Sequence, residues 1–425
     1  MNTGRALSLG IGLLAVGCQD FKVVLGCNAT GPIADNTVAD ATTTVVDAGA
    51  SSTDTGINST DTGASAGDAG SIVSDATATA DAAPDVTGAD TAAAEAATAT
   101  SESGTATALS CQPGGAGLSN CGLLSESCCA SLEVSGGTFF RTFTNNGCGP
   151  TGESDPATVS SFRLDKYLVT VGRFRQFVAA WNGGWVPQAG AGKHTYVNNG
   201  NGLTAPGGVS EPGWVASDKQ YVAPTDANLA CAVNDPEFLP NLAPGSQYST
   251  WTSRPGSQES LPINCVNWYE AYAFCIWDGG FLPSEAEWEY AAFGGSAQLE
   301  YPWGSTPPGS GNQYAIFACD YPTASGTCTG PANIAPVGSA PLGAGLWGHL
   351  DLLGNLFEWN LDWYAANYVN PCSDCANLTA PSPLARVVQG GDFNSSTFYL
   401  PPGKRRDSPT DAYAYAYGIR CARTP

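Results

Sequence analysis

The stretch APVGSAPLGAGLWGHLDLLGNLFEWNLDWY (335–364) joins a loop rich in Gly and Pro to an aromatic and apolar end. The whole chain has a similar composition, because its 425 residues include 52 Gly, 29 Pro and 11 Trp. This Gly and Pro content is typical of long loops between short strands, while the aromatic residues can fill a large core. The stretch therefore predicts a loop-rich domain with little regular structure for its size.

Further motifs lie on both sides of this stretch. In chain order they are GGTFF (136–140), FRLDKYLVTVGRFRQFV (162–178), LPINCVNWYEAYAFCIW (261–277), FLPSEAEWEYAAFGG (281–295), YPWG (301–304), RVVQGG (386–391) and YGIRCAR (417–423). Together they resemble the formylglycine-generating enzyme family, also called the sulfatase-modifying factor family, over residues 131–425. The resemblance implies an α+β fold that is irregular, related to C-type lectins and stapled by disulfides.

Three helices are predicted inside this domain. Apolar residues at helical spacing mark 170–181 and 267–277. A third helix begins at Ser284, which forms an S-x-x-E capping box with Glu287. Glu287 is one of three glutamates in the first turns, where negative charge complements the helix dipole. Acid–base chemistry by paired carboxylates is the alternative interpretation of these glutamates.

The first 18 residues resemble a bacterial lipoprotein signal peptide. Arg5 precedes an apolar run, and LAVGC (14–18) resembles the motif in which the cysteine receives lipid. We therefore predict an exported protein that is anchored through lipid on Cys18 to a bacterial membrane, on its periplasmic or cell-surface face. Ordinary signal-peptide cleavage nearby is the alternative.

The segment 19–110 is predicted to be a disordered tether. Residues 28–110 hold 12 acids, no Lys or Arg and almost no large apolar side chain, so they cannot offset chain entropy by burial. Asp recurs there every seven residues from Asp40 to Asp75. The a and d positions of that period are not apolar, which argues against a coiled coil.

The charge balance argues against a nucleic-acid partner. The formal net charge is −22, of which −11 belongs to residues 111–425. Nucleic-acid phosphates attract basic surfaces, so this acidic chain is not expected to bind them.

An extracytoplasmic peptide, protein or glycan is the expected ligand class.

Export accounts for the cysteines, since 14 of the 15 remain after Cys18 and disulfides form in oxidising compartments. The family resemblance implies a bond between Cys275 and Cys421. Cys319 and Cys328 could close one loop. Cys372 and Cys375 form a C-x-x-C, for which a structural disulfide is preferred over a redox dithiol or half a zinc site. A cysteine-rich collar (111–130, extending into the domain) has open connectivity and contains Cys111, Cys121, Cys128, Cys129 and Cys148.

The resemblance also implies a calcium ion. Its ligand positions correspond to Asp351, Gly354, Leu356 and Glu358, and carboxylate and carbonyl oxygens are the donors that calcium prefers. The alternative is that Asp351 and Glu358 only cap or pair on a loop. A second family calcium site corresponds to Ile316 and Thr329, which are poor ligands, so we expect the Cys319–Cys328 disulfide in its place.

The catalytic positions differ from the family pattern. Family enzymes oxidise a substrate cysteine to formylglycine with oxygen and copper(I), which two cysteines five residues apart hold. Counted from Gly390 and Gly391, those positions are Ser395 and Leu400, which do not suit copper(I). Asp392 replaces the family's Ser, and Phe357 replaces its Trp. Copper is therefore not expected, and no residue is assigned a catalytic role.

Other polar residues offer no clear replacement. His194 and His349 are the only histidines, and His349 is expected to pair with Asp351 on a loop. Ser395 has no histidine near it in the sequence. The basic run 404–406 is expected to form a rim, with contact to an acidic ligand as the alternative. The polar residues that could line the former substrate cleft are Asp392, Asn394, Ser395 and Asp407.

Two functions are consistent with this sequence. The first is a membrane-anchored extracytoplasmic protein whose sulfatase-modifying-factor domain binds a peptide or glycan without oxidising it. The alternative is a formylglycine-generating oxidase, or another protein-modifying enzyme, with a divergent active site. The missing thiol pair favours the first, although one scaffold can host unrelated sites.

Overall fold

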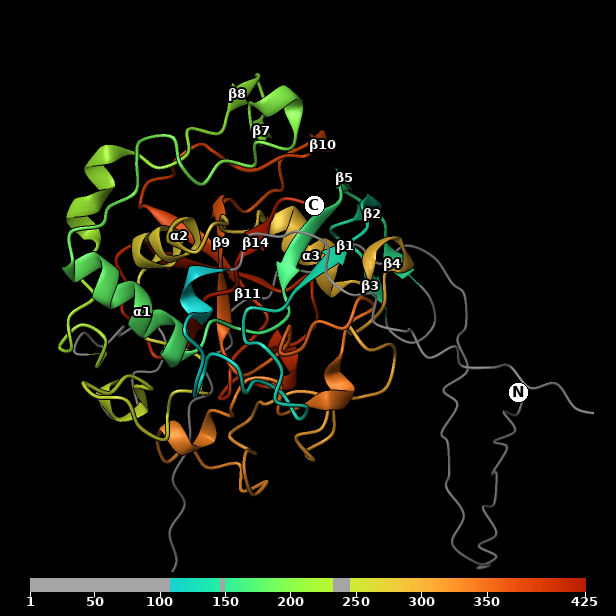
Figure 1. The fold of residues 1–425 in the computed structure, drawn as a ribbon. Coiled ribbons are helices and arrows are strands. Elements are labelled where there is room, and N and C mark those ends of the chain that lie inside the picture. Colours follow the sequence, from blue (N-terminus) through green and yellow to red (C-terminus); the bar gives the residue numbers. More distant parts are fainter. Residues whose placement is uncertain (1–107, 146–149, 232–244) are drawn as a thin grey trace, which may run out of the picture. The chain divides into compact units, whose positions relative to one another are not determined.

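The computed structural model describes residues 108–145, 150–231 and 245–425 (Figure 1). All described residues belong to one compact unit within residues 103–425. The predicted signal peptide, Cys18, Cys148 and all but the last three residues of the predicted tether lie outside the described residues. In the part of the chain that is described, no helix is both long and apolar enough to cross a membrane.

All three predicted helices are confirmed. They are α1 (Val171–Asn182), α2 (Trp268–Trp277) and α3 (Glu285–Ala292). The capping box of Ser284 and Glu287 is present at the start of α3, and Asn267 forms a second capping box at the start of α2. Capping satisfies backbone N–H groups that the helix itself leaves free. Local sequence therefore fixes where these helices begin.

The strands are short and form several small sheets. One sheet joins β1 (Ser131–Val134), β6 (Phe162–Asp165) and β14 (Ala422–Arg423), and another joins β2 (Gly137–Phe140), β5 (Pro156–Val159) and β10 (Cys372–Ser373). Two hairpins are formed by β3 (Thr144–Asn145) with β4 (Pro150–Gly152), and by β7 (Thr204–Ala205) with β8 (Val209–Ser210). Most of the remaining described chain consists of loops and turns.

A four-stranded sheet carries the candidate site. Its order is β12 (Arg405–Pro409), β11 (Ala385–Gln389), β9 (Phe357–Trp363) and β13 (Tyr417–Gly418). The two central strands are antiparallel, with Gln389 opposite Glu358 at one end and Arg386 opposite Trp363 at the other. The end of β11 and the start of β9 therefore meet at one edge of the sheet.

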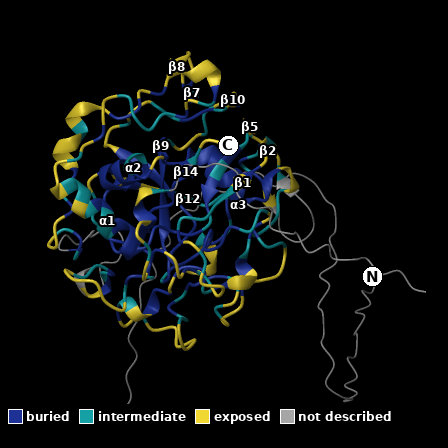
Figure 2. Ribbon diagram, viewed as in Figure 1, coloured by how far each residue is buried: buried dark blue, intermediate teal, exposed yellow. Residues whose placement is uncertain are grey.

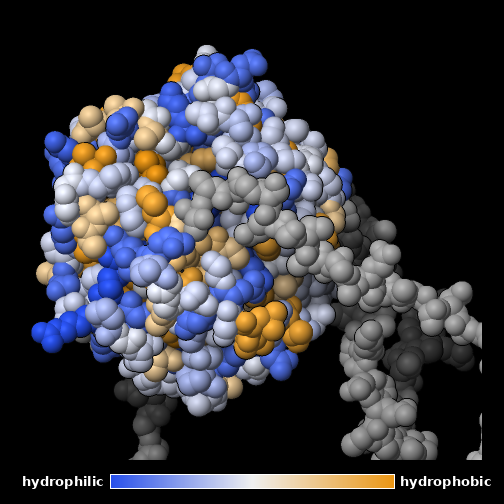
Figure 3. All heavy atoms as spheres, viewed as in Figure 1, coloured by the Kyte–Doolittle hydropathy of each residue, from blue (hydrophilic) through white to orange (hydrophobic). Residues whose placement is uncertain are grey.

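An aromatic core surrounds these central strands. Figure 2 shows that buried residues concentrate on α2, α3 and β9, while exposed residues lie mostly on the outer segments. Phe174 and Phe177 of α1 pack against Phe274 of α2, with ring centroids 5.7 and 5.9 Å from it. The face in Figure 3 is mostly hydrophilic, with small separate hydrophobic patches. The buried aromatic residues of the described chain belong to three clusters, and these phenylalanines lie in the largest.

Buried ion pairs attach the N-terminal collar to this core. Arg173 of α1 contacts Asp165 at 2.9 Å and Asp278 at 2.7 Å, with both ends of each pair inaccessible to solvent. The same arginine donates to Ser110 Oγ and to the Cys128 carbonyl, at 2.9 and 3.1 Å. The collar is therefore part of the folded domain.

The described residues contain six disulfides. They are Cys111–Cys129, Cys121–Cys128, Cys231–Cys265, Cys275–Cys421, Cys319–Cys328 and Cys372–Cys375. The three pairs named from the sequence are present among them. The collar pairs and Cys231–Cys265 join residues whose partners the sequence left open. The fold class, a loop-rich and disulfide-stapled α+β domain, is as predicted.

Candidate functional site

Two glycines direct the backbone into the candidate site. Gly390 and Gly391 follow β11 with φ of +98° and +74°, a region that favours glycine. A Cβ on Gly390 would lie 2.8 Å from the Leu352 carbonyl oxygen. The Gly390 carbonyl accepts a hydrogen bond from Gly354 N at 2.7 Å, which joins the loop after β11 to the loop before β9. The positions predicted from the family pattern, Ser395 and Leu400, follow these glycines.

Ser395, at the first altered cysteine position, forms a closed pair with Asp392. Its hydroxyl donates to Asp392 Oδ1, and Asp392 N donates back to Ser395 Oγ at 3.1 Å. Both residues are buried. Burial raises the pKa of Asp392 to about 6, although the bonds from Ser395 and the charge of Arg406 act against that shift. The Ser395 hydroxyl therefore donates its proton to a carboxylate. Within the described ranges, no histidine forms a hydrogen bond with this hydroxyl.

Leu400, at the second altered position, is an apolar core residue. It is fully buried in a cluster with Trp288 of α3 and with Phe317 and Leu353 from neighbouring loops. A leucine there offers no ligand atom for a metal. The polar Ser395 and the apolar Leu400 therefore take two different structural roles.

An aromatic wall lies beside the altered pair. Phe357 is fully buried, and its ring centroid is 6.4 Å from that of Tyr399. The guanidinium carbon of Arg406 lies 5.1 Å from the Tyr399 ring centroid and 5.8 Å from that of Phe357. A cation over aromatic faces is attracted by their electron density. The wall therefore brings a positive charge close to Asp392.

The basic run 404–406 does not form the uniform rim expected from the sequence. Arg405 makes a two-pronged ion pair with the buried Glu285 at 2.5 and 2.8 Å. Lys404 lies 4.1 Å from the centroid of the exposed Phe398 ring, and Arg406 points to the aromatic wall. Arg405 and Arg406 are consecutive in β12, so their side chains point to opposite faces, while Lys404 precedes the strand.

The predicted cleft residues are only partly brought together. Asp392, Asn394 and Ser395 share one loop, and the Asn394 Oδ1 atom lies 3.3 and 3.2 Å from the sulfurs of Cys319 and Cys328. Asp407 is exposed in β12, and no hydrogen bond links its side chain to the other three in the described chain.

The Cys319–Cys328 disulfide lies against the loop that carries Asp392 and Ser395. Cys319 N donates to the Phe393 carbonyl at 2.7 Å, and Ala318 N donates to the Ser395 carbonyl at 3.0 Å. Ile316 and Thr329 are the two positions of the second family calcium site. The Ile316 carbonyl accepts a hydrogen bond from Asn355 N at 2.7 Å. Thr329 donates its hydroxyl to Asn333 at 3.2 Å. Both positions have protein partners, and the replacement of that site by the disulfide stays a prediction.

The predicted calcium ligands fit a cation only in part. Asp351 is buried and accepts from Gly338 N at 2.6 Å; burial raises its pKa to about 6. Glu358 instead has both oxygens bonded to Arg420, at 2.8 to 3.1 Å, and also accepts from Trp288 Nε1 at 2.7 Å. Arg420 thus neutralises the charge that calcium would need at Glu358. Calcium binding stays a prediction, and no step of the function below depends on it.

His349 does not pair with Asp351, so that expectation was wrong. The imidazole is completely buried, and its Nε2 donates to the Leu164 carbonyl at 3.2 Å. Burial, together with the nearby charge of Arg420, lowers the pKa of His349 to about 3. The ring is therefore neutral and has a structural role.

His194 occupies a charged site that the sequence did not reveal. Its Nδ1 lies 3.0 Å from a Glu211 oxygen and its Nε2 lies 3.0 Å from a Glu287 oxygen, with all three side chains buried. Burial opposes protonation, but the two carboxylates outweigh it and raise the pKa of His194 to about 10. Glu287 is therefore more than a helix cap, because it also holds a distant loop. No local pattern signals this, since its partner lies 93 residues away.

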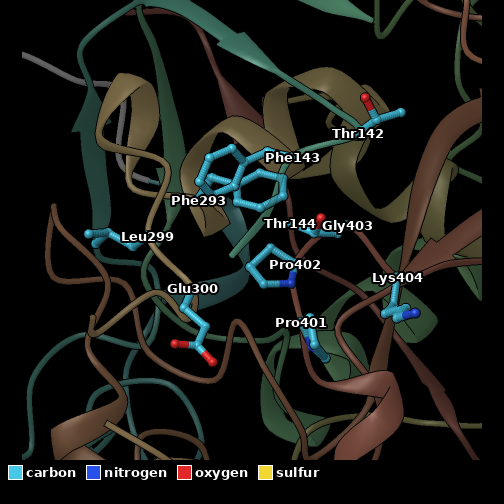
Figure 4. A pocket seen from close by; sticks show the side chains of 10 residues that line it. All are labelled: Thr142, Phe143, Thr144, Phe293, Leu299, Glu300, Pro401, Pro402, Gly403 and Lys404. Carbon is cyan, nitrogen blue, oxygen red and sulfur yellow. The ribbon is translucent and has the colours of Figure 1, made fainter. Parts of the chain in front are cut away.

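An apolar pocket lies beside the segment that follows Leu400. It encloses about 190 Å³ and is lined by Thr142, Phe143, Thr144, Phe293, Leu299, Glu300, Pro401, Pro402, Gly403 and Lys404. The Phe143 and Phe293 rings meet edge to face at 6.0 Å. Figure 4 shows Glu300 and Lys404 on opposite sides of the two prolines. The pocket therefore combines an aromatic floor with one acidic and one basic group.

These features define a class: a loop-rich, disulfide-stapled domain of formylglycine-generating-enzyme type, with Ser395 and Leu400 on the loop that follows β11. Residues 124–425 match the model of the sulfatase-modifying factor enzyme 1-like domain. The chain belongs to this family.

Several known proteins are similar to this chain. The formylglycine-generating enzyme of Thermomonospora curvata is 31% identical over 315 residues, which cover 69% of this chain and 93% of the relative. A mouse protein named inactive C-alpha-formylglycine-generating enzyme 2 is 28% identical over 302 residues, covering 69% and 85%. Among solved structures, PvdO from Pseudomonas aeruginosa aligns with a TM-score of 0.43 and 20% identity, over 69% of this chain and 94% of that one.

Proposed function

We propose that this protein is a binding module built on a formylglycine-generating-enzyme scaffold and that it does not oxidise cysteine. The observation that carries the proposal is the pair of altered positions. Ser395 is bonded to Asp392, and Leu400 is buried in an apolar cluster. Copper(I) prefers soft thiolate ligands, and neither side chain supplies one. The alternative, an oxidase or another modifying enzyme with a divergent site, has no comparable support.

An extracytoplasmic peptide is the ligand class that the pocket in Figure 4 favours. Aromatic and proline side chains line it, and Glu300 and Lys404 stand at its edges. Such a site can bury an apolar residue of an extended peptide while its charged neighbours pair with the two edges.

The proposed location is the extracytoplasmic side of a bacterial membrane, with attachment through lipid on Cys18. The support is the set of six disulfides, which is typical of an oxidising compartment. The motif LAVGC (14–18) supports the lipid anchor.

A peptide and glycan array tests the ligand class. The full chain is applied together with Lys404→Glu, which reverses the charge at the pocket edge, and with Arg254→Glu, which makes the same charge change at an exposed position outside the pocket. We expect peptides that carry an acidic residue to bind, Lys404→Glu to weaken them and Arg254→Glu to leave them unchanged. Equal effects of the two variants, or binding to glycans alone, would refute the peptide assignment.

A further inference from the structure

At the end of the central strands opposite the candidate site, Arg386 lies between two tryptophan rings. Its guanidinium carbon is 3.7 Å from the Trp268 ring centroid and 3.4 Å from that of Trp363. The two rings are 6.5 Å apart and inclined by 22°, so the planar cation is stacked between them. This stacking fixes the direction of the guanidinium plane.

The charge of Arg386 has no direct counter-ion. Its Nη1 donates to the Leu361 carbonyl, while Nε is buried without a hydrogen-bond partner. Across residues 108–145, 150–231 and 245–425, no carboxylate forms an ion pair with it. Burial lowers its pKa to about 9, against the weaker influence of groups that include Asp362 and Asp218. A buried cation of this kind is costly unless an anion joins it.

A small cavity opens onto this cation. Its volume is about 60 Å³, and its walls include Trp363, Leu378 and Val215 beside Arg386. Two carboxylates also line it, Asp218 and Glu211, and Glu211 is already paired with His194. Val215 is 44% exposed and directly precedes the 3₁₀ helix η3 (Ala216–Tyr221), so it lies at the mouth. A cavity of this size holds ordered water, so it has room for a small polar group.

We propose that this cavity binds the carboxylate group of a small ligand. A planar carboxylate matches the planar donor set of arginine and supplies the missing counter-ion. The rest of the ligand lies outside the cavity, against Val215 and Leu378. The site is separate from the one around Ser395, since Arg386 and Asp392 lie at opposite ends of β11, and it does not depend on the proposed peptide binding.

Two carboxylate sources can be compared by calorimetry on the full chain. The probes are N-acetylglycine, which represents a peptide end, and D-glucuronate, which represents an acidic sugar. Their neutral counterparts are N-acetylglycinamide and D-glucose. We expect at least one acid to bind and neither neutral counterpart to bind, and the preferred acid identifies the source. Failure of both acids would overturn the proposal.

A matched pair of surface variants tests the location. Val215→Asp places a negative charge at the cavity mouth, and Leu342→Asp makes the same change at a residue that is 49% exposed on η7 (Pro341–Gly343) and lines neither pocket. We expect Val215→Asp to weaken acid binding about fivefold, by repulsion of like charges, and Leu342→Asp to leave it unchanged. Equal affinities for both variants, with unfolding midpoints like that of the unaltered chain, would place the ligand elsewhere and refute the proposal.

Discussion

Asp351 is a buried carboxylate whose ionisation costs stability in the absence of a bound cation. Its pKa is raised from 3.8 to about 6, so the cost is fully present above pH 6 and is relieved as the pH falls through 6 towards 3.8. We predict that Asp351→Asn raises the free energy of unfolding by roughly 1 to 3 kcal/mol at pH 8 in a calcium chelator. Urea unfolding measures this difference.

The same variant examines the calcium prediction. Millimolar calcium is expected to stabilise the unaltered chain and to leave Asp351→Asn unchanged, because a carboxylate binds calcium more strongly than an amide does. Glu358→Gln is not a suitable control, since it would also break the buried pair with Arg420. A variant that is less stable than the unaltered chain in chelator would show that the Asp351 charge has a partner in the protein.

At the scale of elements, the loop that carries His194 is held on α3 by charge. The pKa of His194 is raised from 6.5 to about 10, so its stabilisation is complete below pH 6.5 and is lost as the pH rises through 10. We predict that His194→Gln lowers the free energy of unfolding by about 3 kcal/mol at pH 6 and by much less at pH 11. Urea unfolding of the unaltered chain and of His194→Gln over this pH range measures the difference. Other groups titrate in both proteins, so the change in the difference reports the histidine. A constant difference would contradict the charged pair.

The collar is the second element that buried charge attaches. Arg173 contacts Asp165, Asp278 and the collar at once. We predict that Arg173→Met destabilises the fold by about 3 to 5 kcal/mol, because it leaves two carboxylates buried with less compensation. Lys166→Met, which removes a half-exposed pair with Glu126, is the matched control and should cost under about 1 kcal/mol. If Arg173→Met and Lys166→Met had similar midpoints of thermal unfolding, the buried ion pairs of Arg173 would not stabilise the collar.

Local sequence patterns predicted the helices, but they could not predict contacts between residues far apart in the sequence. The capping box of Ser284 and Glu287 spans three residues, so the sequence reveals it directly. The partners of Glu285 and Glu287 are Arg405 and His194, which lie 120 and 93 residues away. The spacing of residues in a sequence does not indicate ion pairs between such distant residues. For the same reason, the expected rim of basic residues separated into three different surroundings once β12 was placed.

At the scale of the whole molecule, the Cys275–Cys421 disulfide joins α2 to the C-terminal strand region across 146 residues. We predict that replacing both cysteines by Ala costs about 2 to 5 kcal/mol, because a long loop is released in the unfolded chain. The matched control replaces Cys372 and Cys375, which are three residues apart and constrain the unfolded chain far less. Thermal unfolding should separate the two; equal losses would contradict the loop-length argument.

The family resemblance predicted a site, while the contacts within it came from the fold. Counting from Gly390 predicts that Ser395 and Leu400 share one loop, and the structure has them there; that they are the family's cysteine positions stays a prediction. The bond from Ser395 to Asp392, the contact of Asn394 with the Cys319–Cys328 disulfide and the pairing of Glu358 with Arg420 came only from the structure. Arg386 was not identified from the sequence either, since Trp268 lies 118 residues before it.

The central claim is that this domain does not oxidise cysteine, and product analysis tests it most directly. The full chain is incubated with copper, oxygen and a sulfatase-type cysteine peptide, beside the Thermomonospora curvata enzyme as a positive control, and mass spectrometry follows conversion of the thiol to an aldehyde. We predict no aldehyde from the unaltered chain, and copper(I) binding only in the double variant Ser395→Cys/Leu400→Cys. Aldehyde formed by the unaltered chain would contradict the account, because it would show that oxidation proceeds without the thiol pair.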